Sequence, residues 1–296
     1  MNTDTVEALN ARLATGDDAR FEAGEGGLVR LAVRTPRATG QVYLHGAHVT
    51  AWQPAGHAPV LWMSGSSRFE PGKPIRGGVP LCFPWFGPHA SDASAPAHGL
   101  ARLTAWNPTA LNRTADGDVV IELQQRMADF ELTYTVSIGL TLTMTLHVLN
   151  RSSAAVRAEA ALHTYLTVGD VKQVRISGLG GATYVDKTEG GARRRQGDEP
   201  IMFTGETDRV YVATEAACVL DDPAMLRRIT VEKSGSRSTV VWNPWIAKAK
   251  RMEDFGDDEW PGMCCIETAS VGEDALQLPP GGDHAITASL SVQRTA

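Results

Sequence analysis

The sequence predicts an all-β protein built from antiparallel sheets, and three observations support this class. The clearest is the run Tyr134–Val148, in which apolar side chains at even-numbered positions alternate with polar or small ones at odd-numbered positions. The 29 glycines and 16 prolines are spread over the whole chain, as expected of many strands joined by turns. A convincing amphipathic helix is predicted only at Val6–Leu13. We therefore expect a many-stranded sandwich.

The Tyr134–Val148 run is too long for one ordinary strand, so we place a tight turn near Ile138 and Gly139 and predict a hairpin with one buried face. Period-two patterns and turn residues predict further strands. In chain order these are Leu28–Thr35, Gln41–His45, Val119–Gln124, Gln173–Gly178, Arg209–Val212, Ile229–Lys233, Thr239–Trp242, Cys264–Thr268 and Ala285–Val292. The segment Gly190–Pro200, with its triplet Arg193–Arg195, is predicted to be a solvated surface loop.

The segment Val156–Val168 is predicted to be one more strand, and it carries the most informative residue of the chain. With period two, one face is apolar and the other presents His163 and Tyr165, on a side we expect to be wet or lined by a ligand. An imidazole titrates near neutral pH, so a histidine beside a phenol and a carboxylate is a candidate acid or base. A hydrogen-bonded surface histidine is the alternative.

Composition limits the class of protein further. With 296 residues, 43% of them hydrophobic, the chain can form a single sandwich domain over 1–296, in which roughly the first 20 residues are an N-terminal extension. The four cysteines have no spacing typical of disulfide frameworks or zinc sites. No signal peptide or membrane span is predicted, and the net charge of −6 argues against nucleic-acid binding. We expect a soluble, cytoplasmic monomer.

Several segments occur in an order that resembles the hexose-6-phosphate mutarotases, the glucose-6-phosphate 1-epimerase branch of the aldose 1-epimerase family. They are QVYLHGAHVTAW at 41–52, VLWM at 60–63, PIRGGVPLCFPWFG at 74–87, HGLAR at 98–102, LHTYL at 162–166, DRVY at 208–211, VWNPW at 241–245 and IET at 266–268. The resemblance extends from about residue 28 to 292. It implies a galactose-mutarotase-like β-supersandwich that binds a hexose phosphate and needs neither cofactor nor metal.

The resemblance also implies roles for individual residues. His163 matches the general acid of the family and Glu267 the general base. Residues that match substrate contacts are Arg76, Arg102 and Asp208. Each has a structural alternative: Glu267 could pair with an arginine, Arg76 could form a surface salt bridge, and Asp208 could cap a turn. Some relatives have Gln where this chain has Ala97, so the fine sugar preference is left open.

Three further features stay open at this point. His98 could supply a second imidazole near the sugar ring oxygen, or it could be structural. The tryptophans and phenylalanines of the matched motifs are mostly expected in the core, with Trp242 and Phe86 as the first candidates for ligand contact. Lys248 could add positive potential near a phosphate, although a solvated position is the simpler expectation.

Interconversion of α and β anomers requires removal of the proton from the anomeric hydroxyl and protonation of the ring oxygen, so that the ring opens, rotates and closes again. A carboxylate and an imidazolium suit these two steps. We expect a modestly raised pKa for Glu267 and a bell-shaped pH profile, with Glu267 ionising on the acid side and His163 losing its proton on the alkaline side. The alternatives are a non-catalytic sugar-phosphate-binding protein and a glycoside-cleaving enzyme, which would ordinarily need two carboxylates.

Overall fold

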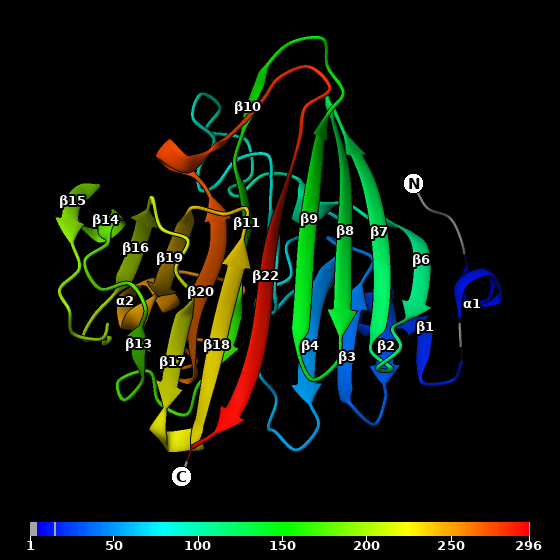
Figure 1. Cartoon of the computed structure of the whole chain (residues 1–296), viewed down its shortest axis with the longest axis horizontal. Coiled ribbons are helices and arrows are strands. Elements are labelled where there is room, and N and C mark those ends of the chain that lie inside the picture. The colour runs from blue at the N-terminus through cyan, green and yellow to red at the C-terminus, as the bar shows by residue number, and fades with distance from the viewer. Residues whose placement is uncertain (1–4, 15, 296) are drawn as a thin grey trace.

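The computed structural model describes residues 5–14 and 16–295, and within them antiparallel strands dominate. Two sheets of eight strands form the body of the molecule (Figure 1). The first, which we call the front sheet, has the order β13-β17-β18-β22-β9-β8-β7-β6. Its strands are β6 (Asn107–Arg113), β7 (Val119–Met127), β8 (Phe130–Ile138), β9 (Leu142–Asn150), β13 (Arg175–Ser177), β17 (Cys218–Asp222), β18 (Arg227–Ser234) and β22 (Asp283–Arg294).

The second large sheet, which we call the site sheet, has the order β15-β14-β16-β19-β20-β11-β5, and β12 also pairs with β20. It lies behind the left part of the front sheet in Figure 1, and β20 contacts β22. Its strands are β5 (Leu81–Cys82), β11 (Ala160–Leu162), β12 (Tyr165–Thr167), β14 (Thr183–Asp186), β15 (Ala192–Arg195), β16 (Thr207–Val212), β19 (Ser238–Asn243) and β20 (Met263–Ser270). The helix α2 (Trp245–Ala249) follows β19.

A smaller N-terminal sheet packs behind the right part of the front sheet (Figure 1). It contains β1 (Ala19–Ala23), β2 (Val29–Arg34), β3 (Ala38–Tyr43) and β4 (His48–Pro54) in that order. Trp52 of β4 is buried and donates its indole N–H to the carbonyl of Gly139 in the turn after β8 (3.0 Å). This hydrogen bond fixes the N-terminal sheet against the front sheet. The last sheet is the pair β10 (Val156–Ala158) and β21 (Leu276–Leu278).

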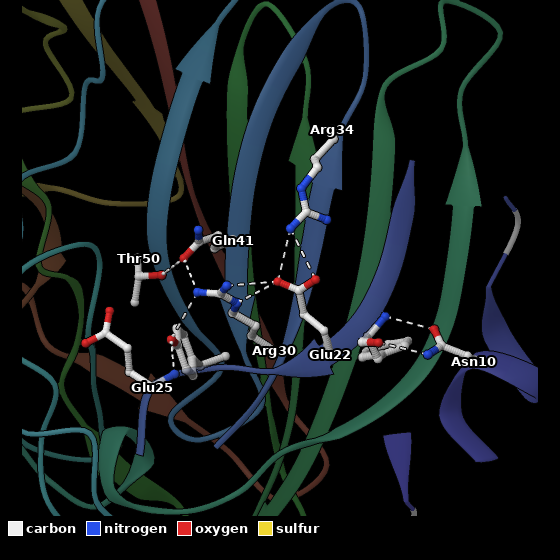
Figure 2. A network of polar contacts seen from close by, with 9 residues as sticks. Asn10, Glu22, Glu25, Arg30, Arg34, Gln41 and Thr50 are labelled. Carbon is white, nitrogen blue, oxygen red and sulfur yellow. Dashed lines mark hydrogen bonds and ion pairs between the residues drawn. The ribbon is translucent and has the colours of Figure 1, made fainter. Parts of the chain in front are cut away.

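The helix α1 (Val6–Leu13) begins at Thr5, whose hydroxyl accepts the N–H of Ala8, and buries Leu9. Asn10 donates to the carbonyl of Phe21 and accepts its N–H, both at 2.8 Å. Figure 2 shows these bonds beside a chain of polar contacts along the sheet, from Glu22 through Arg30 to Gln41. The helix is therefore attached to the sheet by apolar packing and by the hydrogen bonds of Asn10.

The predicted hairpin is confirmed. The strands β8 and β9 are joined by a turn at residues 139–141, and buried positions alternate with half-buried ones along both. The buried face includes Tyr134, Val136, Met144 and Leu146, which share the core between the sheets. This confirms the all-β class and its antiparallel arrangement, and the helix predicted at Val6–Leu13 is confirmed as well.

Two predictions were wrong. The segment Val156–Val168 is not one strand: β10 pairs with β21, whereas β11 and β12 pair with β20. The side predicted to be wet or lined by a ligand is buried at both His163 and Tyr165, since β12 lies between β20 and the segment at residues 60–62. This excludes the wet alternative, and a ligand lining stays a prediction. The triplet Arg193–Arg195 belongs to the edge strand β15 and not to a loop, although it is exposed as predicted.

Candidate active site

The acid and base predicted from the sequence lie in contact on the site sheet. Glu267 projects from the interior of β20, with only 1% of its surface exposed. Its Oε1 lies 3.3 Å from Nε2 of His163, which stands between β11 and β12. Among the described residues, Oε2 of Glu267 and Nδ1 of His163 have no hydrogen-bond partner. One oxygen of the buried carboxylate thus has its hydrogen-bonding capacity unused.

A local turn aims His163 at Glu267. The N–H of Thr164 donates to the carbonyl of Leu162 (2.9 Å), a three-residue turn with His163 at its apex. The imidazole stacks on the ring of Tyr165 at 4.7 Å and 14°, and the edge of Trp242 lies 6.0 Å from it. The expectation that His163 and Tyr165 share a face therefore holds, although that face is buried.

Burial moves the pKa values of the pair in opposite directions. The pKa of Glu267 lies well above the ordinary 4.5, because burial disfavours the carboxylate and Asp208 adds repulsion, while Arg102 opposes the shift. The pKa of His163 lies well below 6.5, because of burial and the nearby His98, Arg76 and Arg102. The rise for Glu267 is larger than the modest one expected from the sequence, since β20 is buried along its whole length. These shifts favour a protonated, uncharged Glu267 beside an uncharged His163.

His98 lies beside His163 as a neutral imidazole. Its backbone has a positive φ of 64°, and its ring meets Phe86 at 4.8 Å and His163 at 5.6 Å, edge to face in both cases. Burial and the charges of Arg102 and Arg76 lower its pKa to about 3. A neutral ring can offer a hydrogen bond to a sugar oxygen without adding charge. Phe86 and Trp242, the first candidates for ligand contact, pack against His98 and His163 respectively, and their contact with a ligand stays a prediction.

Arg102 is a buried cation without an acidic partner. It lies in the short 3₁₀ turn Ala101–Leu103 and exposes only 7% of its surface. One guanidinium nitrogen donates to the carbonyl of Ala97 (2.8 Å), whereas Nε finds no partner. None of the ion pairs formed within 5–14 and 16–295 includes it. A buried charge that lacks a counter-ion is costly, so this position favours an anionic ligand.

Arg76 is held quite differently. Its guanidinium donates to the phenol of Tyr165 (2.8 Å) and to Asp254 (3.1 Å), and the ion pair with Asp254 is largely shielded from solvent. The alternative of a salt bridge is thus correct for Arg76, but the bridge is not at the surface. Because Arg76 and Asp254 neutralise each other, Arg76 offers an anion less net charge than Arg102 does.

Asp208 lies inside β16, opposite Trp242 of β19, so it does not cap a turn. Its pKa is raised, chiefly by burial, and its carboxylate lies 3.5 Å from Nζ of Lys248 on α2. Lys248 also pairs with Glu206 (3.2 Å) and lies over the ring of Trp242 (5.8 Å). The structure therefore brings all six predicted residues into one electrostatic cluster, and adds Tyr165, Asp254 and Lys248 to it.

The loop that carries Arg76 depends on close packing of its glycines, which gives a stability prediction. At Gly78 φ is 59°, and an added Cβ would lie 2.2 Å from the carbonyl oxygen of Val49. Gly72 has a similar φ of 77° but open space around it. We expect Gly72→Ala to lower the free energy of unfolding by about 1–2 kcal/mol from backbone strain alone, and Gly78→Ala by more than about 3 kcal/mol. Thermal unfolding followed by circular dichroism would measure this, and equal losses would contradict it.

The described residues form no group of three His, Cys, Asp or Glu side chains that could hold a metal ion. All four cysteines are buried free thiols, as their spacing predicted. No helix within the described part of the chain is long and apolar enough to cross a membrane.

A buried carboxylate–imidazole pair on an antiparallel sandwich has the groups that general acid–base chemistry uses. The chain belongs to the aldose 1-epimerase family, whose sequence pattern matches residues 30–291. It is 36% identical to an Escherichia coli protein provisionally named glucose-6-phosphate 1-epimerase, over 82% of this chain and 83% of that protein. A Cenchrus ciliaris protein with the same provisional name is 33% identical, over 86% and 82% of the two chains.

Solved structures show the same fold. A Salmonella typhimurium protein provisionally described as a mutarotase superposes with a TM-score of 0.87 at 31% identity, covering 95% of this chain and 96% of that one. Galactose 1-epimerase from Lactobacillus acidophilus superposes with a TM-score of 0.72 at 11% identity, covering 94% and 99%, a likeness of fold alone. The galactose-mutarotase-like fold predicted from the sequence is thereby confirmed.

Proposed function

We propose that this protein interconverts the α and β anomers of hexose 6-phosphates, with D-glucose 6-phosphate as the leading candidate. The observation that carries the proposal is the Glu267–His163 contact at 3.3 Å beside a buried Arg102 that forms no ion pair with any described residue. The first feature suits ring opening and the second suits a phosphate. The provisional names of the Escherichia coli and Cenchrus ciliaris relatives support the choice of sugar.

In this mechanism the Glu267 carboxylate takes the proton of the anomeric hydroxyl while the His163 imidazolium gives its proton to the ring oxygen. The bond between the anomeric carbon and the ring oxygen breaks, which leaves an open-chain aldehyde. Rotation about the neighbouring carbon–carbon bond presents the other face, and the reverse transfers close the ring and restore both groups. The protons balance, and the mechanism forms no covalent intermediate.

The mechanism requires the proton that the pair shares to be on His163, whereas burial favours it on Glu267, where both side chains are uncharged. Hydrogen bonds from sugar hydroxyls to Oε2 of Glu267, which is free, would stabilise the carboxylate. The proton can then reside on His163 across the existing contact. Substrate binding thus prepares the acid and the base in one step.

Asp208 would hold sugar hydroxyls by charge-assisted hydrogen bonds, and His98 would act as a neutral hydrogen-bond partner near the ring. We also propose that the protein acts as a monomer. We further propose a cytoplasmic location, since the free thiols fit a reducing compartment.

The pKa directions change the pH profile expected from the sequence. Activity requires exactly one proton on the pair, so kcat/KM falls when the pair gains a second proton or loses its only one. The lowered pKa of His163 places the acid limb below pH 6.5, and the raised pKa of Glu267 moves the alkaline limb upward. We expect a broad plateau through neutral pH, measured as kcat/KM from pH 4 to 10. An acid limb centred above pH 6.5 would argue against this assignment.

The proposed function is tested with freshly dissolved α-D-glucose 6-phosphate, whose β anomer is consumed by a β-specific coupled dehydrogenase. We expect the protein to accelerate the appearance of the β anomer over the spontaneous rate, and to act much less on free glucose. Tight binding of glucose 6-phosphate without acceleration would favour the non-catalytic alternative.

A further inference from the structure

The general acid His163 lacks the polar anchor that usually orients a catalytic imidazole. Such a ring is commonly fixed by a hydrogen bond on the nitrogen remote from the reaction. Here Nε2 faces Glu267, and the remote Nδ1 has no hydrogen-bond partner in the described part of the chain. Apart from the contact with Glu267 and a backbone contact within His163 itself, no polar group in the described part of the chain fixes the plane of the ring.

Tyr165 supplies the missing constraint by packing. Its ring lies almost parallel to that of His163, with centroids 4.7 Å apart, and it is fully buried. The Tyr165 ring also stacks on Trp62 at 5.7 Å and 21°. Of the rings that contact His163, it is the one that lies face to face, since His98 and Trp242 approach edge on.

The phenol of Tyr165 is itself fixed by a buried ion pair. Arg76 donates to the phenol oxygen at 2.8 Å and to Asp254 at 3.1 Å. The segment that carries Asp254 is anchored a second time, because the adjacent Phe255 packs on Trp62 at 4.9 Å. The contacts form a chain from Asp254 through Arg76 and Tyr165 to His163.

We propose that Tyr165 is the positioning residue of the His163 acid, and that Asp254 fixes Tyr165 through Arg76. This proposal rests on the proposed function, in which His163 must protonate the ring oxygen. It assigns Tyr165 no contact with the reacting atoms. The effect of Tyr165 is to keep the His163 imidazole in the one plane from which it can contact both Glu267 and the sugar.

The proposal predicts graded losses. Tyr165→Phe keeps the stack and removes the bond to Arg76, so we expect kcat to fall about 3- to 10-fold, and Tyr165→Leu, which removes the stack, should lower it about 10- to 100-fold. KM should stay within about twofold of wild type in both. Asp254→Asn should lower kcat as Tyr165→Phe does without raising KM, since it leaves more charge on Arg76 for the anion. The matched control is Tyr211→Phe, which removes a phenol hydrogen bond of 2.8 Å to Gln196 and should leave kcat unchanged.

A double-mutant comparison separates positioning from a general structural role. In a His163→Ala background, Tyr165→Phe and Tyr165→Leu should cause no further loss, because the ring they position is gone. The proposal is overturned if they lower kcat by the same factor in both backgrounds, or if both single variants keep wild-type kcat. Tyr165→Phe preserves the buried ring, so it remains informative if Tyr165→Leu fails to fold.

A second measurement does not depend on catalysis. In the ligand-free protein labelled with ¹⁵N at histidine, we expect His163 to populate one tautomer in wild type and a mixture in Tyr165→Leu and Asp254→Asn. If wild type fails to anomerise any hexose phosphate, the proposed function is wrong, yet this spectrum still tests the positioning. Unchanged ring shifts in all the variants would refute it.

Discussion

Glu267→Gln is expected to lower kcat for anomerisation by at least about 10²-fold while the protein stays folded. The amide keeps the shape of the side chain but cannot take the proton of the anomeric hydroxyl, and a positioned proton transfer typically contributes about 10² to 10⁴ in rate. Because Glu267 is buried and its contact with His163 is its principal polar one, the change should not disturb other parts of the sheet. Steady-state kinetics and circular dichroism on the same preparation measure both effects.

His163→Ala should lose a comparable factor, since it removes the acid of the same pair. Glu122→Gln is a matched control, because Glu122 is a half-buried carboxylate of the front sheet that bonds to Thr109 and lies outside the site. It should retain wild-type turnover. If Glu267→Gln or His163→Ala kept more than about half of wild-type kcat, we would abandon the role assigned to that residue.

The second large effect concerns the phosphate. Arg102→Ala should weaken kcat/KM for glucose 6-phosphate by about 10- to 150-fold, because a charge-assisted hydrogen bond is worth roughly 1.5–3 kcal/mol. Free glucose has no phosphate, so Arg102→Ala should lower kcat/KM for free glucose only slightly. Arg76 also matches a substrate contact of the family, but its pairing with Asp254 leaves it less net charge for the phosphate. Arg76→Ala should also lower turnover on free glucose, since it releases Tyr165.

Arg68→Ala is the matched control for charge, because it removes one positive charge from an exposed ion pair with Glu253. It should alter neither substrate preference nor turnover appreciably, since exposed charges are screened at physiological salt. Equal losses on glucose and glucose 6-phosphate in Arg102→Ala would mean that Arg102 is structural and that the proposed phosphate specificity is wrong.

The fold was predictable where local pattern and tertiary packing agree. The alternation over Tyr134–Val148 gave the hairpin because both strands bury one face against the other sheets. The pattern failed at Val156–Val168 because the turn around His163 and the burial of both sides depend on contacts with distant segments. No alternation in the sequence signals a three-residue turn inside an apolar run.

The residues of the candidate site were likewise predictable only in part. The motifs supplied His163, Glu267, Arg102 and the other predicted residues, and the structure brings them together. Asp254 gave no signal, because it stands in an acidic stretch with Asp257 and Asp258 that is typical of a solvated loop. Its pairing with Arg76 joins positions 178 residues apart, which sequence patterns cannot reveal.

Exchange spectroscopy tests the central claim most directly, because it observes both anomers of glucose 6-phosphate at equilibrium without a coupling enzyme. Proton spectra resolve the α and β anomeric signals, and enzyme at low concentration should produce exchange cross-peaks between them. The account predicts these cross-peaks with wild type, much weaker ones with Glu267→Gln, and weak ones for free glucose. Absence of exchange with wild type on glucose 6-phosphate, or full exchange with Glu267→Gln, would contradict it.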